Sequence, residues 1–231
     1  LKHIVKQEGK APADYTLGVV GVGNVGKLVV EHARHWGFRV LMCDPPRYER
    51  EGGDFLPIED VARQADILTL HTPLDTTTHH LVDTKLLSEM PHDAIVINAS
   101  RGGVVDNLAV ANSSHRYAFD VWESEPHIDP KTLQQAMLAT PHIAGYSLQG
   151  KANATSMSIN ALARHFNLPL TEWRPTEVSP TTPRLLSWEE LCETIDEYCP
   201  IEEETRMLKS NPELFESLRN NYREQALRFR R

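Results

Sequence analysis

Three polar residues that follow predicted strands are of the types that move protons and bind carboxylates. They are Arg101, Glu125 and His142. A histidine can take up the proton of a hydroxyl as hydride leaves the adjacent carbon, and a carboxylate can hold its other ring nitrogen. An arginine can bind a substrate carboxylate through two parallel hydrogen bonds. This set suits the oxidation of a 2-hydroxy acid, although each residue taken singly also fits a structural loop position or a surface charge.

A glycine-rich pattern, Gly21-Val22-Gly23-Asn24-Val25-Gly26, follows a predicted strand and opens a predicted helix. Its glycines would allow a tight turn, close approach of a pyrophosphate, and packing of helix on strand. Asp44 ends the next strand, where it can accept hydrogen bonds from ribose hydroxyls and repel a 2′-phosphate. The pattern therefore predicts an NAD site, and Arg47 and Arg50 nearby leave NADP open. A glycine-rich turn without a ligand is the alternative interpretation.

Alternating strands and helices must position these residues. Apolar spacing predicts strands at 16–21, 39–43, 67–71, 94–98 and 117–122, and helices at 25–36, 58–64 and 83–90. Near-continuous apolar strands separated by helices indicate an α/β fold with a doubly wound parallel sheet covered on both faces. Because the carboxyl ends of such strands meet at one edge of the sheet, we expect Arg101, Glu125 and His142 to converge there.

The pattern changes after His142. Residues 148–167 are typical of one long helix, and 169–183 contain four prolines, which indicates a linker. Ser187 and Glu190 form a capping box that predicts the start of a further helix.

The composition is that of an ordinary globular protein: 231 residues, 40% hydrophobic, 24% charged, net charge −8. The acidic balance argues against a nucleic-acid partner, and no apolar run approaches the ~20 residues that span a bilayer. The three cysteines, Cys43, Cys192 and Cys199, cannot all pair, which favours a reducing cytoplasmic compartment. No histidine near Cys192 and Cys199 completes a metal-ligand set, so we expect no metal.

Together these motifs resemble the D-isomer-specific 2-hydroxyacid dehydrogenase family. The matching segments are residues 21–26, His71-Thr72-Pro73-Leu74, 98–105, 120–126 and 141–145. The resemblance implies that His142 is the catalytic acid and base, Glu125 its carboxylate partner and Arg101 the cation that orients the substrate. It also implies substrate contacts from Arg101, His142 and Tyr146. The NAD contacts it implies are Gly21, Gly23, Asn24, Val25, Gly26, Asp44, His71, Thr72, Pro73, Ala99, Ser100, Arg101, Asp120, His142 and Gly145.

Within the family, residues 43–47 and 142–151 resemble the branch that oxidises 4-phospho-D-erythronate to the 2-oxo acid phosphate in pyridoxine (vitamin B6) biosynthesis. Residues 217–223 resemble the extra C-terminal dimerisation domain of that branch, which implies a homodimer. Another family member, such as a phosphoglycerate dehydrogenase, is one alternative. A non-catalytic NAD-binding dimerisation module is another.

Two features depart from the family pattern. Family members begin with a substrate-binding half-domain, whereas the glycine motif here starts at Gly21. We therefore expect residues 1–14 to be the end of an interdomain helix with a linker, 15–147 the NAD-binding Rossmann domain, 148–168 a helix returning to the substrate domain, and 169–231 a linker and part of an α+β dimerisation domain. The spacing of 19 between Arg101 and Asp120 is also short. It predicts little room for a helix over 106–116, or residues missing from the chain.

Overall fold

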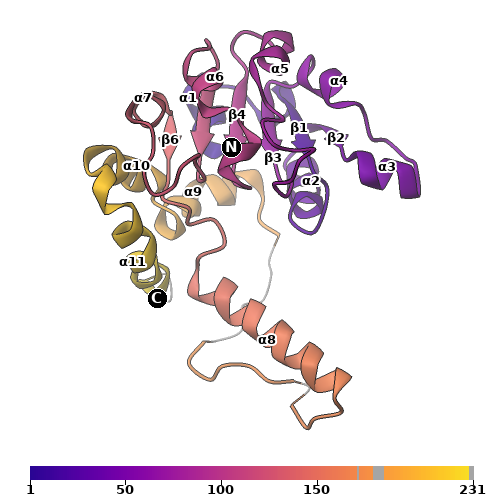
Figure 1. Ribbon diagram of the computed structural model, residues 1–231, viewed down its shortest axis with the longest axis vertical. Coiled ribbons are helices and arrows are strands. Elements are labelled where there is room, and N and C mark those ends of the chain that lie inside the picture. The colour runs from indigo at the N-terminus through magenta and orange to yellow at the C-terminus, as the bar shows by residue number, and fades with distance from the viewer. Residues whose placement is uncertain (171, 179–184, 229–231) are drawn as a thin grey trace.

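Six parallel strands form one sheet in the computed structural model, in the order β2-β1-β3-β4-β5-β6 (Figure 1). The structure describes residues 1–170, 172–178 and 185–228, with side chains up to residue 222. The chain runs from β1 outward to β2 and then crosses back to β3, so β1 and β3 flank the point where the strand order reverses. The strands are β1 Thr16–Val20, β2 Arg39–Cys43, β3 Ile67–Leu70, β4 Ile95–Asn98, β5 Arg116–Phe119 and β6 Leu138–Ala139.

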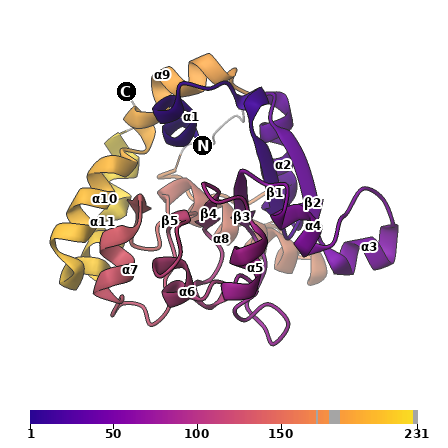
Figure 2. The same cartoon turned by 90° about the horizontal axis from the view of Figure 1, so that it is seen from above.

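Helices cover both faces of this sheet, and the predicted doubly wound α/β fold is confirmed. Figure 2 shows α1 and α9 on one face and α5 and α6 on the other. The helices are α1 Lys2–Glu8, α2 Gly26–His35, α3 Pro45–Glu51, α4 Ile58–Ala62, α5 Thr84–Glu89, α6 Asn107–Ala111, α7 Pro130–Gln135, α8 Leu148–His165, α9 Trp188–Tyr198, α10 Ile201–Ser210 and α11 Phe215–Arg228. Short 3₁₀ helices lie at Pro12–Asp14, Gly102–Val104 and Pro212–Leu214.

The two faces of the sheet carry two separate apolar cores, because successive side chains of a strand point to opposite faces. Leu17 and Val19 of β1 pack in the core under α1 and α2, whereas Val20 packs in the core under α4 and α5. Gly18 lies between Leu17 and Val19 and permits the close approach of helix α4, since a Cβ there would meet Val61 Cγ1 of that helix at 2.6 Å. Helix packing therefore depends on a missing side chain in the middle of β1.

The crossover from β4 to β5 corrects the expectation that 106–116 leaves little room for a helix. Helix α6 forms there in five residues, with the Asp106 side chain accepting a hydrogen bond from the backbone N–H of Ala109 at 2.9 Å. A strong N-cap lets one short helical stretch complete the crossover. The sequence patterns also missed α3 and α7, which contain too few apolar residues to show a period, and the two-residue strand β6.

Helix α10 covers the β6 edge of the sheet. The backbone N–H of Ala139 in β6 donates to Thr205 Oγ1 of α10 at 3.0 Å, which satisfies an edge donor without another strand. The sequence predicted an α+β segment here. The described residues contribute only helices α9, α10 and α11 and the 3₁₀ turn, because their apolar side chains recur at helical spacing. Residues 171 and 179–183 of the predicted linker lie outside the described residues.

Helix α8 projects from the body of the molecule (Figure 1). Its apolar side chains are largely exposed, with Met157 at 74% and Leu162 at 56% of their full accessibility. Over the residues that the structure describes, no helix combines the length and apolar character needed to cross a bilayer.

Candidate active site

The glycine motif joins β1 to α2 in a turn whose three glycines have different surroundings. Gly21 has φ 83°, and a Cβ there would meet the His71 carbonyl carbon at 2.8 Å. A Cβ on Gly26 would lie 2.0 Å from the Gly21 oxygen, so helix and turn touch. A Cβ on Gly23 would meet nothing within 4 Å. Packing therefore explains Gly21 and Gly26, whereas Gly23 leaves its backbone open to a ligand such as a phosphate.

Asp44 ties this turn to the end of β2. Its Oδ2 accepts from the Val22 backbone N–H at 2.8 Å, and its Oδ1 accepts from the Arg47 backbone N–H at 2.9 Å. A carboxylate has about four acceptor positions, so two remain for hydroxyl groups of a ribose. The Arg47 guanidinium is held by Glu51, with Nη2 and Oε2 2.6 Å apart. Because Glu51 engages this guanidinium, Arg47 is less available to bind the 2′-phosphate of NADP. The geometry therefore agrees with NAD as the cofactor.

His71 and Thr72 follow β3, beside the glycine turn. The imidazole of His71 lies 3.1 Å from Thr69 Oγ1, and burial lowers its pKa to about 4. His71 is therefore neutral at physiological pH. The hydroxyl of Thr72 is buried and has no hydrogen-bond partner among the described residues. Such a group normally finds a partner, so Thr72 is suited to bind a ligand at this edge. Pro73 is exposed next to it, as are Asn24 and Val25 of the glycine turn.

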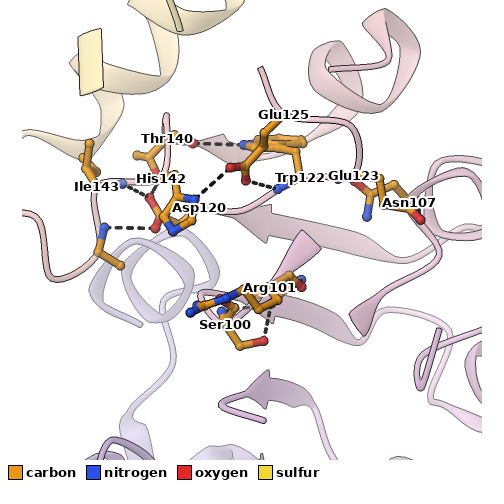
Figure 3. A network of polar contacts seen from close by, with 12 residues as sticks. Ser100, Arg101, Asn107, Asp120, Trp122, Glu123, Glu125, Thr140, His142 and Ile143 are labelled. Carbon is orange, nitrogen blue, oxygen red and sulfur yellow. Dashed lines mark hydrogen bonds and ion pairs between the residues drawn. The ribbon is translucent and has the colours of Figure 1, made fainter. Parts of the chain in front are cut away.

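His142 and Glu125 meet at the carboxyl edge, beyond β5 and β6 (Figure 3). His142 Nδ1 lies 2.8 Å from Glu125 Oε2, and the other oxygen of Glu125 accepts from the Trp122 backbone N–H at 2.7 Å. Both side chains are mostly buried, with 24% and 21% of their surfaces exposed. This pairing fixes which ring nitrogen of His142 carries a proton and leaves Nε2 as the nitrogen that can exchange one.

Asp120 holds the segment that carries His142. Its Oδ1 accepts from Thr140 Oγ1 and from the Ile143 N–H, each at 2.7 Å, and its Oδ2 accepts from the Ala144 N–H at 2.9 Å (Figure 3). The carboxylate is buried, and its three donors belong to the segment on either side of His142. Asp120, predicted to contact NAD, thus also shapes the catalytic loop.

Arg101 lies across from the His142–Glu125 pair in Figure 3. Its side chain is exposed, and Nη1 donates to the Ser100 carbonyl at 2.7 Å. Asn98 shapes this turn, because its Oδ1 accepts from the Ser100 hydroxyl at 2.9 Å and its Nδ2 donates to the Arg101 carbonyl at 2.9 Å. A Cβ on Gly102 would lie 2.0 Å from the Trp122 oxygen, so the loops after β4 and β5 touch. The close contact keeps Arg101 and Glu125 on one side of the sheet.

Glu123, the competing acid two residues before Glu125, has other partners. Its Oε1 lies 2.6 Å from His80 Nε2, and its Oε2 accepts from the Asn107 backbone N–H at 3.0 Å. It therefore ties together the loops that precede α5 and α6.

A pocket of about 290 Å³ adjoins these residues. Three predicted cofactor contacts line it, namely Ala99, Asp120 and Gly145. Sequence reasoning missed other residues here: Asn98, Thr140, Cys199 and Tyr222. Asn98 lies in the matched 98–105 segment and could have been found there. Cys199 and Tyr222 belong to segments that are distant in the sequence, and no residue spacing predicts that they line this pocket. Tyr146 lies one turn beyond His142, with its N–H donating to the Ile143 carbonyl at 2.8 Å.

Comparison with known proteins agrees with this geometry. Residues 3–144 match the family model described as "D-isomer specific 2-hydroxyacid dehydrogenase, NAD binding domain". The erythronate-4-phosphate dehydrogenase of Bacteroides thetaiotaomicron is 40% identical over 223 residues, which cover 92% of this chain and 64% of that protein. The erythronate-4-phosphate dehydrogenase of Photorhabdus laumondii is 45% identical over 166 residues, covering 68% of this chain and 44% of the other. The chain thus spans less than two thirds of the length of these relatives.

Solved structures show the same fold. The D-lactate dehydrogenase of Lactobacillus jensenii, crystallised with NAD⁺, superposes with a TM-score of 0.58 at 26% identity. The match covers 74% of this chain and 57% of that one.

Proposed function

The chain belongs to the D-isomer-specific 2-hydroxyacid dehydrogenase family, and from this membership we propose that it is the NAD-binding part of an enzyme that oxidises 4-phospho-D-erythronate to the corresponding 2-oxo acid phosphate. The observation that carries the proposal is the pair formed by His142 and Glu125 at 2.8 Å. It stands opposite an exposed arginine, Arg101, at the edge where NAD-binding folds place their substrates.

His142 is the general base in this proposal. Its Nε2 takes the proton of the C2 hydroxyl, while Glu125 holds Nδ1–H and stabilises the imidazolium that forms. When bound, NAD supplies the acceptor for the hydride that leaves C2. In the reverse direction the imidazolium returns the proton to the carbonyl oxygen.

Arg101 is the substrate-orienting cation. No acid is paired with its guanidinium among the described residues, and one nitrogen is held by the Ser100 carbonyl. The remaining donors can bind the C1 carboxylate in a bidentate manner and polarise the oxygen on C2. Binding the carboxylate at Arg101 would set the C2 hydroxyl toward His142.

We propose that the residues implied by the family motifs contact the cofactor, and that each binds a different part of it. Gly23 leaves room for the pyrophosphate, and Asp44 takes the ribose hydroxyls. Thr72 supplies a buried hydroxyl that lacks a protein partner among the described residues. Asn24, Val25, His71, Pro73, Ala99, Ser100 and Gly145 line the rest of the edge.

We also propose the division into residues 1–14, 15–147, 148–168 and 169–231. The exposed apolar residues of α8, such as Met157 and Leu162, suit a helix that packs on a substrate-binding domain. We assign the C-terminal helices to the contact of a homodimer, supported by the exposed Leu185, Tyr198 and Leu214. Three free cysteines favour a cytoplasmic enzyme.

The test is turnover by the full-length protein with NAD and 4-phospho-D-erythronate, followed by NADH absorbance. We expect this acid to give the highest kcat/KM in a panel that includes 3-phosphoglycerate and D-lactate. Robust activity with another acid alone would overturn the substrate assignment. Tight NADH binding in a fluorescence titration without turnover of any acid would favour a non-catalytic module.

A further inference from the structure

Two cations lie over the ring of Tyr146, next to the catalytic loop. Lys151 Nζ is 3.2 Å from the ring centroid, and the Arg219 guanidinium carbon is 4.9 Å from it. Lys151 belongs to the first turn of α8, whereas Arg219 belongs to α11, so segments far apart in the sequence supply the two charges. Among the residues whose side chains are described, neither cation forms an ion pair with an acid. Tyr146 thus marks a small region of positive charge.

Among the residues whose side chains are described, no anion balances this arrangement. The Nε of Arg219 is buried and has no hydrogen-bond partner among the described residues, which is costly for a charged donor. Lys151 stands near the N-terminus of α8, where the helix dipole is also positive, and the first turn of α8 contains no acid. A cation–π contact places each charge over the Tyr146 ring but gives the buried Nε of Arg219 no oxygen acceptor among the described residues.

The cations lie close to the catalytic residues. The hydrogen bond from the Tyr146 N–H to the Ile143 carbonyl closes a turn, which keeps the two Cα atoms within about 7 Å. Ile143 directly follows His142. On the other side, Tyr222 is one helical turn from Arg219 and lines the same pocket as Asp120 and Gly145. An anion held here would therefore be the far end of a molecule whose other end is at His142.

We propose that Lys151 and Arg219 form a subsite for the phosphate group of the substrate, with Tyr146 as the platform that holds the two cations. This inference rests on the proposed function. It adds the residues that would distinguish a phosphorylated hydroxy acid from an unphosphorylated one. A doubly charged phosphate offers each cation charge-assisted hydrogen bonds and accepts from the orphaned Nε of Arg219.

The experiment compares two substrates of the full-length enzyme, 4-phospho-D-erythronate and D-erythronate. In Arg219→Gln and in Lys151→Gln we expect the preference for the phosphorylated acid, measured as the ratio of kcat/KM values, to fall about tenfold or more. Arg206→Gln, an exposed arginine of α10 outside this cluster, is the matched control and should keep the wild-type ratio. An equal loss on both substrates would overturn the proposal, because a phosphate subsite must discriminate between them.

Inorganic phosphate gives a readout that does not depend on turnover. We expect calorimetry to detect its binding to the wild type and a loss of about tenfold in affinity in Arg219→Gln. Unchanged phosphate affinity would overturn the subsite. A fall in NADH affinity in place of phosphate affinity would assign the cations to the cofactor and also overturn it. If the wild type turns over no phosphorylated acid, the proposed function fails, and the phosphate titration alone then decides whether the anion site exists.

Discussion

The carboxylate of Asp120 accepts a hydrogen bond from the backbone N–H of Ile143 at 2.7 Å, and the backbone carbonyl of Asp120 accepts one from the N–H of His142, also at 2.7 Å. One residue thus binds two successive peptide groups. His142 has φ 55°, in the left-handed region that costs a residue with a side chain roughly 1–2 kcal/mol. The hydrogen bonds that Asp120 accepts offset this cost and set the direction of the imidazole.

Asp120→Asn should therefore lower both stability and kcat. The carboxylate serves three donors, from Thr140, Ile143 and Ala144, whereas an amide has one acceptor oxygen and brings an NH₂ group against a donor. We expect the free energy of unfolding to fall by about 1–3 kcal/mol and kcat to fall at least about tenfold. Urea unfolding and steady-state kinetics measure these. Thr140→Val removes one donor and should have the smaller effect, and full activity in Asp120→Asn would contradict the positioning role.

Glu125→Gln tests the partner of His142. A glutamine can present an NH₂ group to Nδ1 and so favour the tautomer with a protonated Nε2, which cannot take the hydroxyl proton. We expect kcat to fall by roughly 10²–10⁴-fold, with a shifted pH–rate profile and little change in the Kd of NADH. Glu123→Gln is the matched control. It disturbs the contact with His80, so it should lower stability and keep the pH profile of the wild type. The reverse outcome would make Glu123 the functional acid.

Two substitutions in the glycine turn distinguish the glycine that a ligand approaches from the glycine that packing requires. Gly23→Ala adds a methyl group that meets no protein atom within 4 Å, so the melting temperature should hardly change. NADH affinity, measured by fluorescence titration, should nevertheless fall by about tenfold, because the methyl group stands where a pyrophosphate approaches the backbone. Gly26→Ala, with its Cβ 2.0 Å from the Gly21 oxygen, should lower the melting temperature itself. Unchanged NADH affinity in Gly23→Ala would place the cofactor elsewhere.

The parts of the site that the sequence predicts are those encoded locally. The turn at Gly21 to Gly26 and the strands before Arg101 and Glu125 are readable because apolar periodicity and glycine spacing act over a few residues. Thr140 and Arg219 are different, since their roles depend on which segments meet in space. Helix α6 shows a third limit. Spacing predicted little room for it, but the N-cap Asp106 allows a five-residue helix.

His71 gives the protein a stability that depends on pH. Burial lowers its pKa from 6.5 to about 4, so between these values the unfolded chain binds a proton that the folded chain does not. Stability should therefore be complete above pH 6.5 and fall as the pH drops toward 4. From pH 6.5 to 4.5 we expect a loss of about 2–3 kcal/mol attributable to this group.

Urea unfolding of the wild type and of His71→Gln at these two pH values measures the loss, which should be smaller in the variant by this amount. Burial also lowers the pKa of His115, so that imidazole adds a pH-dependent loss to both proteins. Glu8 does not obscure it, because its pKa is lowered to about 2, chiefly by its hydrogen bonds with Lys10 and Arg116. Its contribution is present above pH 4.5 and is lost progressively as the pH falls from 4.5 to 2. An identical pH dependence in wild type and His71→Gln would show that His71 is protonated as easily in the folded protein as in the unfolded chain.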